Sequence, residues 1–268
     1  MEGQPGAAGT LKIATWNVNS IRARLPRVLA WLEAERPDVL CIQETKVRDE
    51  DFPGAAFAEI GYRSECFGQP MSHGVALVSR VELRGIVRGL ADDPPEAERR
   101  LIGALADGIR VIGVYVPNGT ELGSGRFAAK LAWFRRLRAS LAAWHAPADR
   151  VLVCGDFNVA PADRDVHDPA AWRGNILFHP DEQAALRDLM SWGLVDGFRL
   201  FTEEGGHYTW WDYRAGAFHR GLGLRIDLML MTPALAAECV GVRIDREARK
   251  GPKPSDHAPV VAEFRRGR

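Results

Sequence analysis

Short apolar segments rich in β-branched residues recur along the whole chain, and they constrain the fold more than any other feature. Each segment is bounded by Gly, Pro, Asn or Asp and is too short for a typical helix, so each predicts a β-strand. The eight segments are Lys12–Trp16, Val39–Gln43, Gly74–Ser79, Arg110–Val116, Val151–Cys154, Arg225–Met231, Val240–Ile244 and Pro259–Phe264.

Three segments between these strands have helical periodicity. Apolar residues from Leu25 to Leu32 follow the i, i+3, i+4, i+7 spacing, and Pro37 ends that helix. Residues 131–144 repeat the pattern, and a third helix opens at Pro180, with acidic residues in the turn where the helix dipole favours them.

About ten strands with only a few helices predict an α+β fold. We expect two packed, mainly antiparallel or mixed sheets flanked by helices, which is a four-layer α/β sandwich. No Ser/Gly linker or compositional shift divides the chain. The prediction is therefore a single domain over residues 11–268, preceded by a disordered tail over residues 1–10.

Composition excludes several classes of protein. The 35 basic and 35 acidic residues cancel, which argues against a protein that coats nucleic acid indiscriminately. The longest uncharged stretches, such as Leu228–Ala237, fall far short of the roughly 20 residues of a membrane span. The start of the chain has no secretory signal, and the four cysteines form no CxxC pair. These features predict a cytoplasmic protein that does not enter membranes.

Polar side chains lie at the ends of five predicted strands. They are Asn17 and Asn19, Glu44, Asp156 and Asn158, Asp227, and the Asp256-His257 pair. A polar group at the edge of a buried strand costs free energy unless it is paired or binds something. One such residue is usually a turn cap. Five strand ends rich in acids and amides instead indicate the rim of one cleft.

These residue types suit the hydrolysis of a phosphodiester. Carboxylates from separate strand ends can hold Mg²⁺ or Mn²⁺, and the reaction also needs a base for water and a donor for the developing charge. Each residue taken alone has a plainer reading. The plainer interpretation of Glu44 is an ion pair with Lys46, that of Asp156 is a turn cap, and that of His257 is a structural histidine.

The motifs themselves resemble a known family. They are TWNVNSIRAR (15–24), IQETKV (42–47), HGVAL (73–77), YVPNG (115–119), GDFNVAP (155–161), LMSWGLVD (189–196), WWDYR (210–214), GLRIDLML (223–230) and KPSDHAPV (253–260). In this order, from about Leu11 to Phe264, the chain closely resembles the exonuclease III family of DNA repair nucleases. GDFN and SDH alone indicate only the endonuclease/exonuclease/phosphatase superfamily, whereas RIDLML, SWGLVD and WWDYR indicate the exonuclease III branch.

The resemblance implies a metal site and a role for each residue around it. The implied metal-site residues are Glu44, Asn17, Asp256, Asp156 and Asn158. Glu44 is expected to be the principal ligand and Asp256 an alternative one. Asp156 is expected to orient or deprotonate the attacking water, with Asn158 steadying it and contacting the phosphate.

Three further catalytic residues follow from the same resemblance. His257 is expected to bind a phosphate oxygen as a cation, and Asp227 to orient it and raise its pKa. Tyr115 is expected to donate to the phosphate or to stabilise its charge. The family leaves the division of labour between Asp156 and His257 open.

The implied contacts to DNA are Arg99, Arg100, Asn118, Trp210, Trp211 and Leu224. In the family, the two tryptophans and the position of Leu224 wall a pocket for a flipped-out sugar that lacks its base. Adjacent residues of a strand point to opposite faces, so one of the tryptophans is expected in the core. Arg99 and Arg100 may contact the DNA backbone, or they may form only a solvated face.

The activity implied is that of a Mg²⁺- or Mn²⁺-dependent, monomeric, nucleoid-associated enzyme. It would incise duplex DNA 5′ to abasic sites and remove nucleotides or blocking groups from 3′ ends. Residues 119–126 and 163–175 depart from some relatives and leave the balance of these activities open. The alternatives are a superfamily phosphatase acting on small phosphates or lipids, and an inactive member that only binds DNA.

Overall fold

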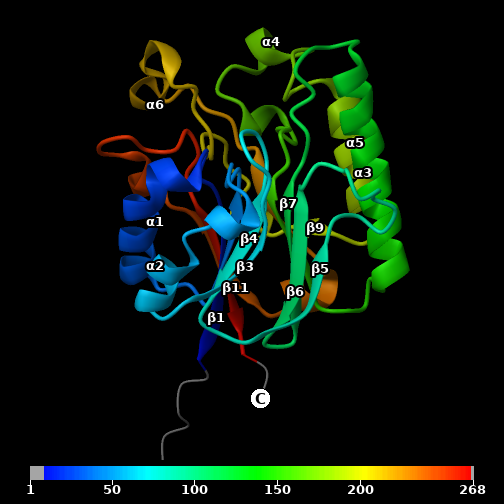
Figure 1. Ribbon diagram of the computed structural model, residues 1–268. Coiled ribbons are helices and arrows are strands. Elements are labelled where there is room, and N and C mark those ends of the chain that lie inside the picture. The colour runs from blue at the N-terminus through cyan, green and yellow to red at the C-terminus, as the bar shows by residue number, and fades with distance from the viewer. Residues whose placement is uncertain (1–8, 267–268) are drawn as a thin grey trace, which may run out of the picture.

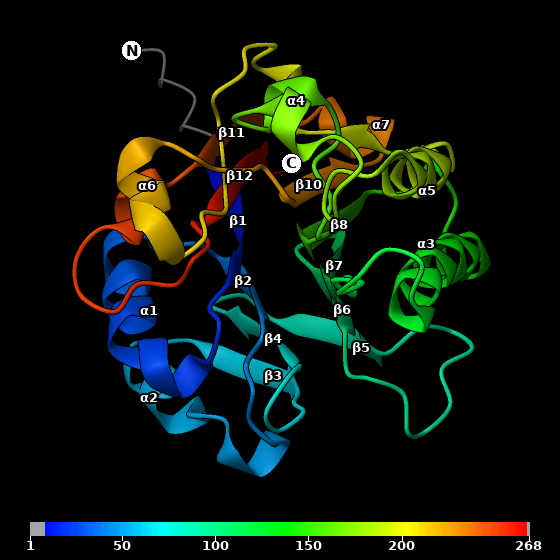
Figure 2. The same cartoon turned by 90° about the horizontal axis from the view of Figure 1, so that it is seen from above.

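Two six-stranded sheets lie face to face, and helices cover their outer faces (Figure 1). The computed structural model describes residues 9–266. Viewed from above, α1 (Ile21–Glu35) and α2 (Gly54–Glu59) cover one side, and α3 (Gly125–Trp144) and α5 (Pro180–Met190) cover the other (Figure 2). The predicted four-layer α+β sandwich is confirmed.

The first sheet contains one parallel pair among antiparallel neighbours. Across the sheet the strands are β11 (Cys239–Ile244), β12 (Val260–Arg265), β1 (Thr10–Asn17), β2 (Val39–Gln43), β4 (Val75–Ser79) and β3 (Arg63–Phe67). β1 and β2 are parallel, and α1 connects them. A parallel pair requires such a crossover, which brings the carboxyl ends of both strands to one edge.

The second sheet repeats this arrangement. Across it the strands are β5 (Leu83–Arg88), β6 (Leu101–Ala106), β7 (Ile109–Tyr115), β8 (Val151–Asp156), β10 (Asp227–Met231) and β9 (Val195–Asp196). β7 and β8 are its parallel pair, connected by α3. The central strands of both sheets are almost completely buried.

Short helices occupy the connections. They are α4 (Pro169–Trp172), α6 (Ala217–Arg220) and α7 (Pro233–Ala236), together with the 3₁₀ turns Asp49–Asp51, Asp163–Asp165, Phe198–Leu200, Arg214–Gly216 and Arg246–Arg249. α4 and α6 lie at the upper edge of the molecule in Figure 1. Among residues 9–266, no helix combines the length and the apolar character needed to cross a membrane.

The core between the sheets consists of alternate strand residues that point inward. It includes Ile13, Val39, Val111 and Met229, all with no exposed surface. Cys41 and Cys154 face each other across the two sheets, with their sulfur atoms 3.5 Å apart as free thiols. Both are the buried core residues that their apolar surroundings predict.

All eight predicted strands and all three predicted helices are present, whereas β3, β5, β6 and β9 were not predicted. β3 and β5 carry charged residues and are only partly buried, so they lack a continuous apolar pattern. β6 reads LIGALA, whose Gly and Ala have low strand propensity. Residues 1–8 of the predicted tail lie outside the described residues. Thr10, the last residue of that tail, is the first residue of β1 and pairs with Arg265 of β12.

Candidate active site

Both sheets carry polar side chains to the same edge of the sandwich. Those side chains belong to Asn17, Glu44, Tyr115, Asp156, Asp227 and His257. β1, β2, β7 and β8 contribute their carboxyl ends. β10 and β12 run antiparallel to β8 and β1, so their amino ends reach the same place. Topology therefore brings together residues that are far apart in the sequence.

Asn17 joins the two sheets at this edge. Its Nδ2 donates to Glu44 Oε1 and to Asp156 Oδ2, both at 2.9 Å, and the Asn17 side chain is fully buried. One amide group therefore holds a carboxylate from each sheet. Two carboxylates brought this close repel each other, and this repulsion favours a cation between them.

The backbone around Glu44 is held in an unusual conformation. Asn19, Glu44 and Lys46 all have positive φ angles, of 45°, 53° and 56°. Non-glycine residues in this region store strain, and such strain concentrates at functional sites. Lys46 Nζ lies 2.8 Å from Glu44 Oε2, as the plainer reading of Glu44 expects, while Glu44 Oε1 faces Asn17.

Asp156, His257 and Asp227 form the most deeply buried charged cluster at this edge. Asp227 Oδ2 lies 2.8 Å from His257 Nδ1, and Asp156 Oδ2 lies 3.8 Å from His257 Nε2. Burial alone would lower the pKa of His257, but the two carboxylates outweigh it and raise this pKa to about 10. The imidazole is therefore a cation at neutral pH.

Burial has the opposite consequence for Asp156. It raises the pKa of this carboxyl to about 7, although His257 and the hydrogen bonds from Asn17 and Asn158 favour the charged form. Asn158 N donates to Asp156 Oδ1 at 2.8 Å, and Asn158 Nδ2 lies 3.4 Å from Asp156 Oδ2. A carboxylate with a pKa near neutrality is suited to accept a proton from water.

Asn118 and Tyr115 border the same site. Asn118 is exposed, and its Nδ2 donates to Asn158 Oδ1 at 3.0 Å. Burial, with Glu44 and Asp156 nearby, raises the pKa of Tyr115 well above its usual value, so its hydroxyl remains a proton donor. Arg100 is buried behind Tyr115, with its guanidinium 4.7 Å from the centre of the ring.

Asp256 directly precedes His257 but has hydrogen-bond partners outside the Asp156–Asp227–His257 cluster. Its Oδ1 accepts a hydrogen bond from Asn19 Nδ2, and its Oδ2 accepts one from Trp210 Nε1, both at 3.0 Å. Lys46 Nζ donates to Asn19 Oδ1 at 2.6 Å, so Asn19 and Lys46 link Asp256 to Glu44. Both oxygens of Asp256 are engaged, as are both oxygens of Glu44, but of the two only Glu44 shares a hydrogen-bond donor with Asp156.

Arg99 faces away from the centre of the site. Its Nη1 donates to Gly68 O at 2.5 Å and pairs with Asp49 Oδ2 at 3.1 Å, and its guanidinium covers the ring of Phe67. Arg100 is almost completely buried, so the solvated-face reading does not apply to it. Of Arg99 and Arg100, only Arg99 presents its guanidinium to solvent.

The predicted sugar pocket is largely filled. Leu224 and Trp211 are 0% and 1% exposed, so neither offers a surface to a substrate in this structure. Trp210 is partly exposed, and Trp172 packs edge-on against it with 6.5 Å between ring centres. Trp211 is therefore the tryptophan of the pair that belongs to the core, as expected for one of the two, although Trp210 forms only isolated bridges and the segment is not a strand.

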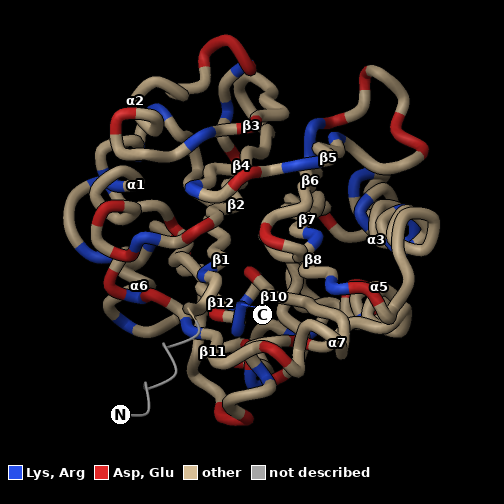
Figure 3. The backbone as a smooth tube through the Cα atoms, turned by 90° about the horizontal axis from the view of Figure 1, so that it is seen from below, with Lys and Arg blue, Asp and Glu red and all other residues tan. Residues whose placement is uncertain are grey.

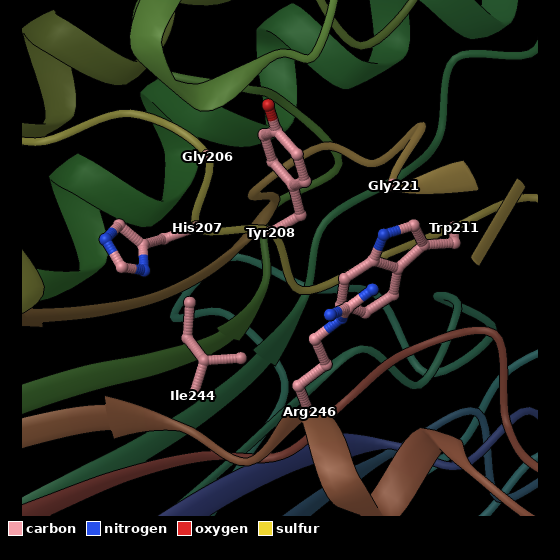
Figure 4. Close-up of a pocket in the computed structure, with 7 residues that line it drawn as sticks. All are labelled: Gly206, His207, Tyr208, Trp211, Gly221, Ile244 and Arg246. Carbon is pink, nitrogen blue, oxygen red and sulfur yellow. The ribbon is translucent and has the colours of Figure 1, made fainter. Parts of the chain in front are cut away.

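A cavity lies next to Trp211, and neither Trp210 nor Leu224 lines it. This cavity has a volume of about 220 Å³, and Figure 4 shows Arg246 over the indole of Trp211, with His207, Tyr208 and Ile244 on the other walls. The centre of the Trp211 ring lies 5.9 Å from the guanidinium carbon of Arg246. The residues of the Asp156–Asp227–His257 cluster do not line this cavity.

Several residues to which sequence reasoning gave no part in the chemistry support the site, although it placed Asn19 at the rim of the cleft. Asn19 links Asp256 to Lys46, and Thr209 Oγ1 accepts the backbone amide of Asp227 at 3.0 Å. His73 lies 6.1 Å from the ring of Tyr115. The HGVAL motif was a signal for His73, whereas Thr209 carries no local signal because its partner is distant in the sequence.

The donors at this edge fit a hard divalent cation. Glu44 Oε1 and Asp156 Oδ2 converge on Nδ2 of Asn17, and Asp227 adds a carboxylate oxygen within 4.8 Å of Asp156, whereas the cationic His257 does not serve as a ligand. Asp227 Oδ1 is buried and has no hydrogen-bond partner within residues 9–266. Oxygen donors with excess negative charge are typical of sites for such ions.

Known proteins share both the sequence and the fold of this chain. Residues 14–257 match the model of the Endonuclease/Exonuclease/phosphatase family. Exodeoxyribonuclease III of Haemophilus influenzae is 36% identical over 95% of this chain and 100% of its own length. An AP endonuclease from Archaeoglobus fulgidus is 44% identical with a TM-score of 0.91, covering 95% of this chain and 99% of its own.

A third relative was solved with nucleic acid. The 3′ phosphatase NExo from Neisseria, bound to product DNA hairpin, is 42% identical with a TM-score of 0.91, covering 95% of this chain and 99% of its own. These matches extend over nearly the whole chain and include every strand that borders the site. The chain therefore belongs to the Endonuclease/Exonuclease/phosphatase family, in its exonuclease III branch.

Proposed function

We propose that this protein is a divalent-metal-dependent DNA repair phosphodiesterase that removes phosphates and nucleotides from 3′ ends and incises 5′ to abasic sites. The observation that carries the proposal is the single edge where Asn17 holds Glu44 and Asp156 while Asp227 holds His257. This edge combines a cation site, a carboxylate base and an imidazolium.

Glu44 and Asp156, joined by Asn17, are the residues we expect to hold the metal, with Asn158 and Asp256 at the margin. The ion we propose is Mg²⁺, with Mn²⁺ as a substitute, because the donors are oxygens. When bound, the metal neutralises charge on the phosphoryl group. Every other contribution comes from the side chains of the protein.

Asp156 is proposed to orient and deprotonate the attacking water. Its pKa of about 7 places proton acceptance near neutral pH. The backbone amide of Asn158 and the amide of Asn17 fix the carboxylate in one orientation. Asn158 Nδ2 also donates to Val116 O at 2.9 Å, which ties it to the loop after β7.

His257 and Tyr115 are proposed to act on the phosphate itself. The imidazolium of His257 attracts an anionic oxygen, and Asp227 prevents the ring from rotating. Tyr115 keeps its proton because burial raises its pKa, so it can donate a hydrogen bond. Arg100 supports Tyr115 from behind, with its Nη1 donating to Tyr115 O at 3.2 Å.

DNA is the proposed substrate because of the relatives, one of which was solved with a DNA product. Of the predicted DNA contacts, Asn118 is exposed, Arg99 and Trp210 are partly exposed, and Arg100 acts only through Tyr115. Positive and negative residues are interspersed over the described chain (Figure 3), so we expect weak non-specific binding. A monomer located with the nucleoid is part of the same proposal.

The geometry favours 3′ ends over abasic sites. Leu224 and Trp211 are buried, and Trp172 covers one side of Trp210. A flipped-out sugar would have to displace these residues, whereas a 3′ end needs no such pocket. We therefore propose 3′-end processing as the main activity and abasic incision as the slower one.

A time course on defined duplexes tests the proposal. One duplex carries a recessed 3′ end with a 3′-phosphate, and a matched duplex carries one abasic analogue. We expect turnover that EDTA abolishes and added Mg²⁺ restores, faster on the first duplex.

Two results would contradict it. Hydrolysis of inositol phosphates without turnover of DNA indicates the small-phosphate phosphatase, and binding of DNA without turnover indicates the inactive member. Faster incision at the abasic analogue contradicts only the preference for 3′ ends.

A further inference from the structure

A buried ion pair lies directly behind the loops of the site. Lys130, in the second turn of α3, and Glu182, in the first turn of α5, are each 0% exposed, and Lys130 Nζ lies 2.5 Å from Glu182 Oε1. Two charges removed from water cost considerable free energy, and apolar residues often replace such a pair without loss of stability. The pair therefore calls for an explanation beyond fastening two helices.

The ammonium group uses all three of its protons. Besides the bond to Glu182, Lys130 Nζ donates to Asn158 O at 2.6 Å and to Asn118 O at 3.1 Å. Glu182 Oε2 accepts the backbone amide of His179 at 3.0 Å, which caps α5. A lysine has only three donors and no acceptor. Two of these three donors therefore bind backbone carbonyls of loops, and only one binds a residue of a helix.

Those two carbonyls belong to residues of the candidate active site. Asn118 lies in the loop after β7, and Asn158 lies in the loop after β8. Asn158 has a φ of 50°, a left-handed conformation that a non-glycine residue keeps only when its surroundings enforce it. The same residue donates its backbone amide to Asp156 Oδ1. The carbonyl held by Lys130 is therefore in the same residue as the amide that orients Asp156.

The stem of Lys130 packs against the first of these loops. Gly119 has a φ of 91°, and a Cβ built there would lie 3.1 Å from Lys130 Cδ. The side chain of Asn118 in turn donates to Asn158 Oδ1. Both loops are thus fixed to one ammonium group and to each other.

We propose that Lys130 is a positioning residue for hydrolysis, acting through Asn158 on Asp156, and that Glu182 serves mainly to neutralise it in the core. The inference rests on the function proposed above. Lys130 touches neither the substrate nor the reacting atoms. Its effect is to hold the loop after β8 in the strained conformation that aims the Asp156 carboxylate.

Three variants separate positioning from stability. Lys130→Met/Glu182→Gln removes both charges, so no lone charge is left buried. Glu182→Gln alone removes the counter-charge but keeps the Lys130 amino group, which even as a neutral amine has two N–H donors for the two carbonyls. Leu141→Ala is the matched control, because Leu141 is fully buried near the other end of α3, in the cluster that packs α3 against α5 and the second sheet.

The measurements are kcat, KM and Tm on the duplex with the 3′-phosphate. For the double variant we expect kcat to fall about tenfold or more, with KM changing less than threefold, because Asp156 is misaligned. For Glu182→Gln and Leu141→Ala we expect kcat within about threefold of the parent, even where Tm falls as far as in the double variant.

Two results overturn the proposal. One is a loss of kcat in the double variant no larger than in Leu141→Ala. The other is an equal loss in Glu182→Gln, which assigns the effect to the pairing of the helices. If the double variant does not fold, Lys130→Gln/Glu182→Gln is measured against the same criteria. A parent protein without turnover on any DNA refutes the proposed function, whereas an active parent with control-like variants refutes only this inference.

Discussion

Two buried ionic clusters lie at different places in the molecule, and they differ in whether their charges cancel. The first, the catalytic cluster, consists of Asp156, Asp227 and His257. The second, the Arg225 cluster, consists of Arg225, Arg199, Asp165 and Asp196. The side chains of both clusters are at most 10% exposed, and both draw their members from distant segments of the chain.

The Arg225 cluster is balanced. Arg225 Nε donates to Asp165 at 2.6 Å, and its two terminal nitrogens donate to the two oxygens of Asp196 at 3.2 and 2.7 Å. Arg199 also pairs with Asp165, so the cluster has a second positive charge for its second carboxylate. Burial would lower the pKa of Arg225, but both carboxylates raise it above its usual value. Two positive and two negative charges cancel, and no charge is left for a ligand.

The catalytic cluster is unbalanced. Two carboxylates face one imidazole, Glu44 adds a third carboxylate through Asn17, and one oxygen of Asp227 has no partner within the described chain. Burial raises the pKa of Asp156 to about 7. The comparison teaches that a buried ionic cluster with an excess of charge is suited to bind a ligand, whereas one whose charges cancel is suited to hold segments together.

The largest effect is expected when Asp156 loses its charge. Asp156→Asn keeps the shape of the side chain but cannot accept a proton, so turnover should fall by about 10²–10⁴-fold. Asp196→Asn removes one carboxylate from the Arg225 cluster and should leave turnover per folded molecule within about threefold. Steady-state rates with both duplexes measure this. Equal losses in the two variants would erase the distinction between the clusters.

The reverse is expected for stability. Arg225→Met leaves Asp165 and Asp196 without their shared partner, so the free energy of unfolding should fall by about 3–5 kcal/mol. Urea denaturation followed by fluorescence measures it, with Asp156→Asn unfolded in parallel. Because the charge of Asp156 is not needed for a balanced pair, we expect that variant to be affected less. A variant Arg225→Met as stable as the parent would contradict the structural role.

Metal binding should depend on pH through the catalytic cluster alone. A proton and a cation compete for Asp156, whose pKa is about 7 in the metal-free protein. Affinity for Mn²⁺ should therefore rise with pH below 7, by up to about tenfold per pH unit, and level off above 8. Calorimetric titrations at pH 6, 7 and 8 measure this. The slope should flatten in Asp156→Asn and persist in Asp196→Asn; the opposite outcome would place the metal elsewhere.

The smallest effect concerns the outer member of the Arg225 cluster. Arg199→Met removes one of the two guanidinium groups on Asp165 and leaves Arg225 to be shared by Asp165 and Asp196. Because Asp165 keeps one guanidinium partner, the cost in the free energy of unfolding should be about 1–3 kcal/mol. Urea denaturation of Arg199→Met and Arg225→Met in parallel measures the ratio of their losses in the free energy of unfolding. A loss as large as that of Arg225→Met would show that the two arginines act as one inseparable unit.

The sequence by itself determined the central strands, the main helices and the residues that end the strands. Apolar periodicity is a local property, so segments such as Val39–Gln43 and Val151–Asp156 are recognisable without knowledge of their neighbours. A carboxylate or an amide directly after such a strand lies at a sheet edge by necessity. For this reason Asn17, Glu44, Asp156 and Asp227 were identified from their positions, and the family motifs agreed with them.

Tertiary structure alone decided which groups meet. Asn17 and Asp156 are 139 residues apart, and Lys130 and Glu182 are 52 apart, so no local pattern reveals either contact. The partly buried strands β3 and β5 depend on pairing with neighbours for their stability. The burial of Trp211 and Leu224, the hydrogen bonds of Asp256 to Asn19 and Trp210, and the balance of the Arg225 cluster likewise depend on packing. The cost of burying a charge is set by the groups around it in space, and the order of residues along the chain does not contain that information.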